Sequence, residues 1–149
     1  MRIVLQRVHE AAVSIQGETH AKISAGLLIF LGITTEDTST DIEWIFQKLI
    51  NLRIFNDNEN KMNLSLIETN GALLIVSQFT LFASTKKGNR PSFIKAAPPS
   101  IAQPLYNEFV SKAKKILPNV ASGIFGADMQ ITLTNDGPVT LIIDSKNKE

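Results

Sequence analysis

Two continuous apolar runs constrain the fold of this chain more than any other feature of its sequence. They are residues 27–33 (LLIFLGI) and residues 73–76 (LLIV). Short runs without polar positions are typical of strands that are buried on both faces. Each run also follows a turn signal, at residues 24–26 (SAG) and 69–71 (TNG). We therefore predict two central strands in a sheet that is covered on both sides.

The second run continues into polar residues without losing its strand propensity. Ser77, Gln78 and Thr80 follow it directly, interspersed with apolar residues. A polar group left unpaired in a buried strand costs roughly 1–3 kcal/mol. These side chains are therefore either paired inside the protein or exposed in a pocket at the end of the strand. The spacing alone favours internal pairing, and the rest of the chain must decide.

Helical spacing of apolar residues predicts two helices. The first covers residues 40–52, where residues 40–43 (TDIE) have the spacing of a capping box. The second covers residues 100–117 and contains Pro104 about one turn after its start. Because a proline inside a helix removes a backbone hydrogen bond, we expect a kink or a later start there.

Alternating apolar and polar residues predict further strands. A first hairpin is expected near the N-terminus, with its turn at residues 16–19 (QGET). Residues 128–134 and 139–143 form two more strands, and residues 135–138 (NDGP) between them favour a hairpin turn. Because strands outnumber helices, we predict an α+β fold: two packed β-sheets, as a sandwich or partial barrel, with two helices on one face. Residues 1–149 suit a single domain.

Basic residues are concentrated in one segment of a chain whose net charge is only +1. Residues 84–115 contain seven Lys or Arg and one acid, a net charge of +6, which leaves −5 for the remainder. Four of these residues lie in a loop directly after the polar strand end: Lys86, Lys87, Arg90 and Lys95. Such a concentration indicates a surface for a polyanion such as nucleic acid. A solvated, lysine-rich face is the alternative, and it is the commoner origin of such a pattern.

The sequence lacks the residues that most enzymes use for acid–base chemistry. It has no cysteines and two histidines, and it contains no phosphate-binding glycine loop, nucleophile elbow or HExxH motif. We expect no metal and no cofactor. Any catalysis must then use backbone donors, a hydroxyl group or a group of the substrate. Since neither a signal peptide nor an apolar span of about 20 residues is found, we expect a cytoplasmic protein that does not bind membranes.

Two short motifs together resemble the signatures of the D-aminoacyl-tRNA deacylases, first described as D-tyrosyl-tRNA deacylases. They are residues 77–81 (SQFTL) and residues 135–140 (NDGPVT), in that order. The similarity covers essentially the whole chain and includes residues 5–8 (LQRV) and 90–93 (RPSF). One departure is Asn60, where the family usually has glycine. Because asparagine also tolerates a left-handed turn, this departure does not argue against the family's function.

The resemblance implies an enzyme for chiral proofreading in translation. Its substrate is a D-amino acid esterified to the 3′ adenosine of a tRNA, and its products are the free D-amino acid and the tRNA. The resemblance also implies a homodimer with two sites at the subunit interface. The residues implied in catalysis are Ser77, Gln78, Phe79 and Thr80. Those implied in substrate binding and chiral selection are Gly137, Pro138, Arg7, Met129 and Phe125.

The family assigns a specific task to the Gly137–Pro138 element. The resemblance implies that its peptide bond is cis and that it reaches into the site of the partner subunit, where its carbonyl groups would occupy the space that an L-side chain needs. Arg7 matches the position that holds this element in place. The segment of residues 84–115, with its net charge of +6, is assigned to the acceptor end of the tRNA, and the dependence of binding on salt tests this assignment.

Two mechanisms are compatible with these residues. Either the Thr80 hydroxyl is the nucleophile, or the ribose 2′-hydroxyl of the substrate assists an attacking water while the protein positions and stabilises. We favour the second, because no base that would activate Thr80 is evident in the sequence. The rival function is a non-catalytic, dimeric module that binds the end of a tRNA or another nucleic acid.

Overall fold

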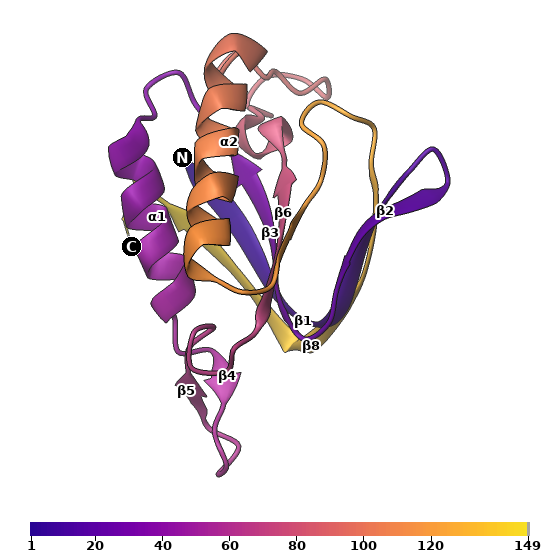
Figure 1. The fold of residues 1–149 in the computed structure, drawn as a ribbon. Helices are drawn as coiled ribbons and strands as arrows, with labels where there is room; N and C mark the ends of the chain where they lie inside the picture. Colours follow the sequence, from indigo (N-terminus) through magenta and orange to yellow (C-terminus); the bar gives the residue numbers. More distant parts are fainter. Residues whose placement is uncertain (149) are drawn as a thin grey trace.

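The computed structural model describes residues 1–148, which form one large mixed sheet, a small two-stranded sheet and two long helices (Figure 1). The strands of the large sheet are ordered β2-β1-β3-β6-β7, and β8 also pairs with β1. Their bounds are β1 Arg2–Ile15, β2 Glu18–Ile23, β3 Gly26–Gly32, β6 Ala72–Ser77, β7 Val120–Ser122 and β8 Gln130–Asp144. The small sheet pairs β4 (Phe55–Asn56) with β5 (Met62–Leu64). The helices are α1 (Ser39–Asn51), the 3-10 helix η1 (Phe79–Phe82) and α2 (Pro99–Ile116).

The two predicted central strands are neighbours in the sheet and are buried on both faces. β3 and β6 pair in parallel, with Leu27 opposite Leu73 and Leu31 opposite Ser77. Successive side chains of a strand point to opposite faces. Leu27 and Leu73 accordingly pack in the core beneath α1 and α2, whereas Leu74 packs in a second core on the other face. Apolar residues at every position are thus required by two separate cores.

The second core exists because the large sheet curls over itself. The outer part of β1, the strand β2 and the first half of β8 cover the face of β3 and β6 that lies opposite the helices. Figure 1 shows β2 and the adjoining ends of β1 and β8 at the right, and both helices side by side at the left. The predicted α+β fold with two helices on one face is therefore confirmed as a nearly closed, partial barrel. The second sheet is only the short β4–β5 ribbon.

The helix starts differ from those predicted. Helix α1 begins one residue earlier, and its capping box joins Thr38 to Asp41, whose carboxylate accepts a hydrogen bond from the Thr38 N–H at 2.9 Å. Helix α2 begins at Pro99, so Pro104 lies inside it. Pro99 suits the first turn because its missing N–H would have no partner there. The predicted later start is therefore wrong, since the helix begins five residues before Pro104, whose side chain is exposed.

The predicted hairpin at residues 135–138 is wrong. β8 is one strand, and both of its halves pair antiparallel with β1. Gln6 lies opposite Thr140 and Val8 lies opposite Asn135, so residues 136–139 bulge out opposite the single residue Arg7. The Asp-Gly-Pro part of the predicted turn therefore lies in a bulge within a continuous strand, while Asn135 stays paired with Val8. A bulge uses the same turn-forming residues as a hairpin, and only the length of β1 distinguishes the two.

A buried carboxylate joins the start of α1 to the end of β8. Asp41 accepts hydrogen bonds from the Ser145 hydroxyl at 2.6 Å and from the Lys146 Nζ at 2.9 Å. Burial by itself would raise the pKa of Asp41, but the hydrogen bonds from Ser145, Lys146 and Thr38 outweigh it and hold the pKa well below its usual value. The ionised form of Asp41 is therefore the one that the folded state favours.

This arrangement predicts a loss of stability in acid. The folded state binds the Asp41 proton more weakly than the unfolded state, where the pKa is about 3.9, so protonation favours unfolding. We expect the free energy of unfolding to fall between pH 6 and pH 3, and Asp41→Asn to remove roughly 1–2 kcal/mol of that change. Urea titrations at both pH values measure it, with Glu18→Gln at an exposed position as the control. A pH dependence identical in Asp41→Asn and the parent would contradict the prediction.

No helix among residues 1–148 is long and apolar enough to span a membrane. Within the same residues there is no group of three or more His, Cys, Asp or Glu side chains arranged to hold a metal ion.

Candidate active site

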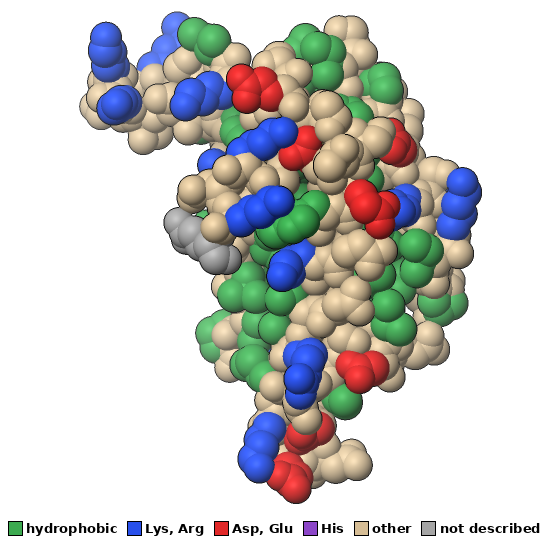
Figure 2. Space-filling view, turned by 90° about the vertical axis from the view of Figure 1, so that its left-hand side faces the viewer, with side chains coloured by type: hydrophobic (Ala, Val, Ile, Leu, Met, Phe, Trp, Pro, Cys, Tyr) green, Lys and Arg blue, Asp and Glu red, His purple; other side chains and the backbone are tan. Residues whose placement is uncertain are grey.

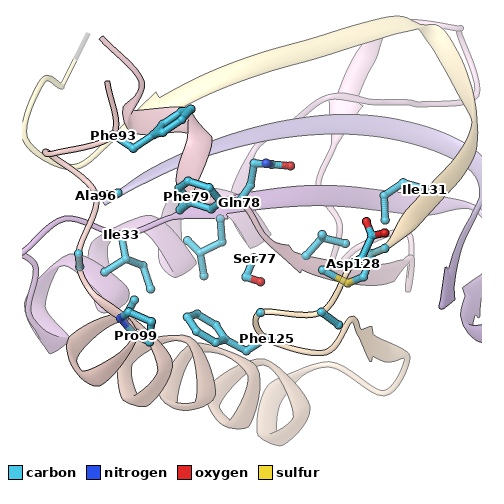
Figure 3. A pocket seen from close by; sticks show the side chains of 17 residues that line it. Ile33, Ser77, Gln78, Phe79, Phe93, Ala96, Pro99, Phe125, Asp128 and Ile131 are labelled. Carbon is cyan, nitrogen blue, oxygen red and sulfur yellow. The ribbon is translucent and has the colours of Figure 1, made fainter. Parts of the chain in front are cut away.

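The polar end of the second apolar run forms the wall of a pocket. The pocket has a volume of about 590 Å³ and lies between the end of β6, the start of α2 and the segment that leads into β8. In Figure 3, Phe79 and Phe93 lie on one side of the cavity, and Pro99 and Phe125 lie on the side of α2. Of the predicted site residues, five line it: Ser77, Gln78, Phe79, Phe125 and Met129. Both sequence-based alternatives hold in part, because Ser77 and Gln78 line a pocket while the side chains of Gln78 and Thr80 also pair with each other.

The chain changes direction at the pocket wall. β6 ends at Ser77, and residues 79–82 form η1 instead of extending the strand as their β-propensity suggested. The Gln78 N–H donates to the Leu31 carbonyl at 2.8 Å, which completes the pairing with β3. The N–H groups of Phe79 and Thr80 have no acceptor among residues 1–148. Two adjacent backbone donors therefore remain free at the start of η1, where a helix always leaves its first N–H groups unpaired.

The Thr80 side chain does not line the pocket. Its hydroxyl accepts a hydrogen bond from the Gln78 amide nitrogen at 2.5 Å. An amide N–H donates and cannot remove a proton, so this partner does not activate the hydroxyl as a nucleophile. Among the described residues that line the pocket, Asp128 alone has a titratable side chain. The site offers backbone donors and shape, with little acid–base chemistry.

Two residues that sequence reasoning missed hold η1 in place. The Arg2 guanidinium donates to the Leu81 carbonyl at 2.8 Å, pairs with Asp144 at 2.8 Å, and lies 4.9 Å from the centre of the Phe82 ring. Gly32 lets η1 approach β3 closely, because a Cβ there would lie 3.0 Å from the Leu81 Cβ and 3.1 Å from the Gln78 carbonyl oxygen. Neither residue belongs to a recognisable motif, so only their spatial contacts reveal the role.

Aromatic side chains gather at the mouth of the pocket. The rings of Phe79 and Phe93 meet edge to face, with centroids 5.1 Å apart, and Phe79 remains 57% exposed. On the opposite side, Phe125 packs against the buried ring of Tyr106 with centroids 5.7 Å apart. Exposed aromatic rings that are grouped beside a cavity indicate a surface for a ligand. Their faces and edges suit the planar ring of a nucleobase.

The Gly137–Pro138 element lies away from this pocket. Neither residue lines it, and the peptide bond between them is cis. Arg7 lies directly beneath the bulge and is only 4% exposed. Its guanidinium donates to the carbonyls of Ile54 at 2.5 Å and Asp136 at 3.2 Å, and it pairs with the Asp136 carboxylate at 2.9 Å. The structure therefore joins Arg7 to the bulge, but it does not bring either to the pocket of the same chain.

The four predicted tRNA-binding residues lie on the loop that follows η1. Lys86, Lys87, Arg90 and Lys95 are exposed, and none forms an ion pair within residues 1–148. Two hydrogen bonds between Ser84 and Ser92, of 2.8 and 2.9 Å, close the loop at its base. In Figure 2, basic side chains crowd the projection at the upper left, whereas acidic and basic side chains are mixed elsewhere on that face. Because Phe93 and Ala96 line the pocket, the loop adjoins it.

Two solved structures share this fold. One, described as c-Myc DNA Unwinding Element Binding Protein, is 39% identical, superposes with a TM-score of 0.91, and the match covers 97% of this chain and 98% of that one. Another is described as a probable eukaryotic D-amino acid tRNA deacylase and superposes with a TM-score of 0.83, and the match covers 95% of this chain and 97% of that one. Because the two sequences are only 17% identical, this similarity shows the fold alone.

The sequence comparisons then identify the family. The family model for D-Tyr-tRNA(Tyr) deacylase matches residues 4–144, and the chain belongs to this family. Proteins named D-aminoacyl-tRNA deacylase are 59% identical in Cytophaga hutchinsonii and 57% identical in Flavobacterium psychrophilum, in each case over 100% of both chains. The predicted family is confirmed, and so is the predicted class of enzyme, a hydrolase.

Proposed function

We propose that the protein hydrolyses D-aminoacyl-tRNA to the free D-amino acid and tRNA, with the 590 Å³ pocket as the site. The observation that carries this proposal is the pair of free N–H groups of Phe79 and Thr80 beside the pocket of a chain in this family. Attack of water on the ester carbonyl places negative charge on the carbonyl oxygen. One well-placed donor to that oxygen contributes roughly 2.7–4 kcal/mol. An aminoacyl ester is already activated, so backbone donors suffice.

The residues around the pocket then take distinct roles. Phe79, Phe125 and Met129 contact the adenosine or the amino acid, and Ser77 and Gln78 shape the wall. Water attacks the carbonyl carbon, the bond to the ribose oxygen breaks, and that oxygen leaves with a proton. The neighbouring 2′-hydroxyl of the ribose assists the attacking water and passes its proton to the leaving oxygen. Thr80 does not take this role, because Gln78 is the only hydrogen-bond partner of its hydroxyl within residues 1–148.

This mechanism predicts a small effect of Thr80→Ala. The substitution keeps the backbone N–H and removes one neutral hydrogen bond, worth roughly 0.5–1.5 kcal/mol, so kcat should fall less than about tenfold. A nucleophile would instead contribute on the order of 10⁴-fold or more. Release of amino acid from D-aminoacyl-tRNA measures kcat, with the exposed Thr85→Ala as the control. A loss on the order of 10⁴-fold or more with intact tRNA binding would overturn substrate assistance.

We infer that the active form is a homodimer in which Gly137–Pro138 enters the pocket of the partner. The element does not line the pocket of its own chain, as expected if it serves the pocket of a second copy. β8 also presents exposed apolar side chains, with Leu141 37% and Ile142 70% exposed, as expected of a strand that another subunit covers. An active species with the mass of one chain, 16.4 kDa, in sedimentation would contradict this inference.

The basic loop serves the tRNA in this proposal. Lys86, Lys87, Arg90 and Lys95 carry four unpaired positive charges next to the pocket mouth. Contacts with phosphates release counterions, so binding should weaken steeply as salt is raised. An affinity for tRNA that does not depend on salt would return this loop to the role of a solvated surface.

The rival function is a nucleic-acid-binding module without catalysis. It is supported by the similarity to the 39% identical structure described as c-Myc DNA Unwinding Element Binding Protein. A direct experiment separates the two: the purified protein is incubated with D- and L-aminoacyl-tRNA carrying the same amino acid. Release of the D-amino acid with retention of the L-ester supports the deacylase. Binding of both without release supports the module.

A further inference from the structure

A second groove adjoins the pocket along the outer face of α2. It has a volume of about 580 Å³ and lies between α2 and the segment that joins β7 to β8. Phe125 lines both cavities, so the groove and the pocket share a wall. The other lining residues come mostly from one face of the helix: Gln103, Tyr106, Asn107, Val110, Ser111, Lys114 and Lys115, with Ser122, Gly123 and Ile124 opposite.

The chemistry of this groove suits a single-stranded polynucleotide. Lys114 and Lys115 are exposed and have no carboxylate partner within residues 1–148, and none of the lining residues is acidic. Amides of Gln103 and Asn107 offer donors and acceptors for base edges, and Ile124 presents an apolar surface that is 47% exposed. Unpaired cations beside apolar and aromatic surface are the usual combination in sites for single strands.

The opposite face of the same helix provides a contrast. Lys112 lies only two residues before Lys114 in the sequence. Its Nζ nevertheless pairs with Glu43 of α1 at 2.5 Å and lies 5.6 Å from the centre of the Phe46 ring. Its charge is therefore already neutralised by a partner in the protein. The positive charge of α2 is divided between a face that packs on α1 and a face that is open to a ligand.

The groove wall is fixed relative to the pocket. The Tyr106 hydroxyl donates to the carbonyls of Ile75 at 3.0 Å and Gly123 at 3.2 Å. Burial raises the pKa of this hydroxyl to about 12, so it stays a donor at any physiological pH. The Gly123 N–H also donates to the Ile75 carbonyl at 2.9 Å. The wall of the groove is therefore held at a constant position relative to the end of β6, two residues beyond Ile75.

We propose that this groove binds the nucleotides that precede the terminal adenosine of the tRNA, with Lys114 and Lys115 at their phosphates. This assignment rests on the proposed function, since it requires the adenosine to occupy the adjoining pocket. A strand that leaves the pocket past Phe125 enters the groove directly. The basic loop after η1 lies on the side of the pocket lined by Phe93, so it contacts a different part of the tRNA.

The test compares two substrates in the full-length protein: a D-aminoacyl-tRNA and the same D-amino acid esterified to adenosine alone. Lys114→Ala/Lys115→Ala should lower the ratio of kcat/KM for the tRNA to kcat/KM for the adenosine ester by about tenfold. The slope of log KM against log salt for the tRNA should fall by about 1.4, since each single-strand phosphate contact contributes about 0.7. Lys112→Ala is the matched control on the same helix and should keep the parental ratio and slope.

The two substrates also separate this inference from the proposed function. Hydrolysis of the adenosine ester by the parent protein tests the pocket and does not involve the groove. If the parent hydrolyses both substrates but the double variant keeps the ratio and slope of Lys112→Ala, the groove assignment is overturned while the deacylase proposal stands. If the parent hydrolyses neither substrate, both fail. A reduced ratio with a reduced slope in the double variant alone supports the groove.

Discussion

Replacing Gly137 by alanine is expected to lower the preference for D- over L-aminoacyl-tRNA by about 100-fold, which is the scale of discrimination that steric exclusion in a pocket supplies. Gly137 has a φ of +132°, a conformation that residues with a side chain rarely adopt. An added Cβ would lie 2.7 Å from the Val139 Cγ2 and 2.9 Å from the Val139 backbone nitrogen. The bulge must therefore shift, and the carbonyl groups proposed to exclude the L-side chain shift with it.

The measurement is the ratio of kcat/KM for the two enantiomers of one aminoacyl-tRNA. Gly17→Ala is the matched control, because Gly17 also has a positive φ, of +84°, but an added Cβ there meets nothing within 4 Å. A urea titration of both variants separates loss of selectivity from loss of folding. If Gly137→Ala has the parental rates on both enantiomers, the proposed steric filter is wrong.

Replacing Arg7 by methionine is expected to lower the free energy of unfolding by about 3 kcal/mol, the upper range for lost hydrogen bonds to a charged group. Methionine keeps part of the side-chain volume but none of the donors. The Ile54 carbonyl then loses a 2.5 Å hydrogen bond in a buried position, and the Asp136 carboxylate loses its 2.9 Å ion pair. Because Arg7 holds the bulge from beneath, the D/L preference should fall as well.

Urea unfolding measures the stability, and the two-enantiomer assay measures the selectivity. Arg53→Met is the control, since Arg53 donates a single 2.8 Å hydrogen bond to the Asn63 carbonyl at an exposed position. Surface substitutions of this kind change stability by less than about 0.5 kcal/mol. Equal stability of the Arg7 and Arg53 variants would show that the bulge is held by its own backbone.

The apolar runs and the polar strand end were the parts of the fold that could be predicted most directly. A strand between two cores needs apolar residues at every position, and β3 and β6 show that pattern because both of their faces are covered. Ser77 and Gln78 interrupt the pattern where the cover ends, and there the pocket opens. Helical periodicity placed α1 and α2 correctly because each buries one face.

The errors arose where local preference competes with distant contacts. Residues 79–82 have the composition of a strand, yet they form η1, since no neighbour continues the pairing beyond Leu31 opposite Ser77. Residues 135–138 have the composition of a hairpin turn, yet they bulge from a continuous strand, since β1 extends far enough to pair with both halves of β8. Propensity describes a residue's own backbone, whereas strand pairing depends on partners far away in the sequence.

The sequence by itself determined the central strands, the helices and the family, because burial patterns and contiguous motifs are local properties of the chain. Tertiary structure decided which groups are left free. It showed that the Gln78 N–H is used by β3 while those of Phe79 and Thr80 are not, and that Arg2 and Gly32 position η1. It also showed that Lys112 is paired with Glu43, whereas Lys114 and Lys115 line the open groove. Free donors and free charges are defined by what surrounds them, and those surroundings form only when the chain folds.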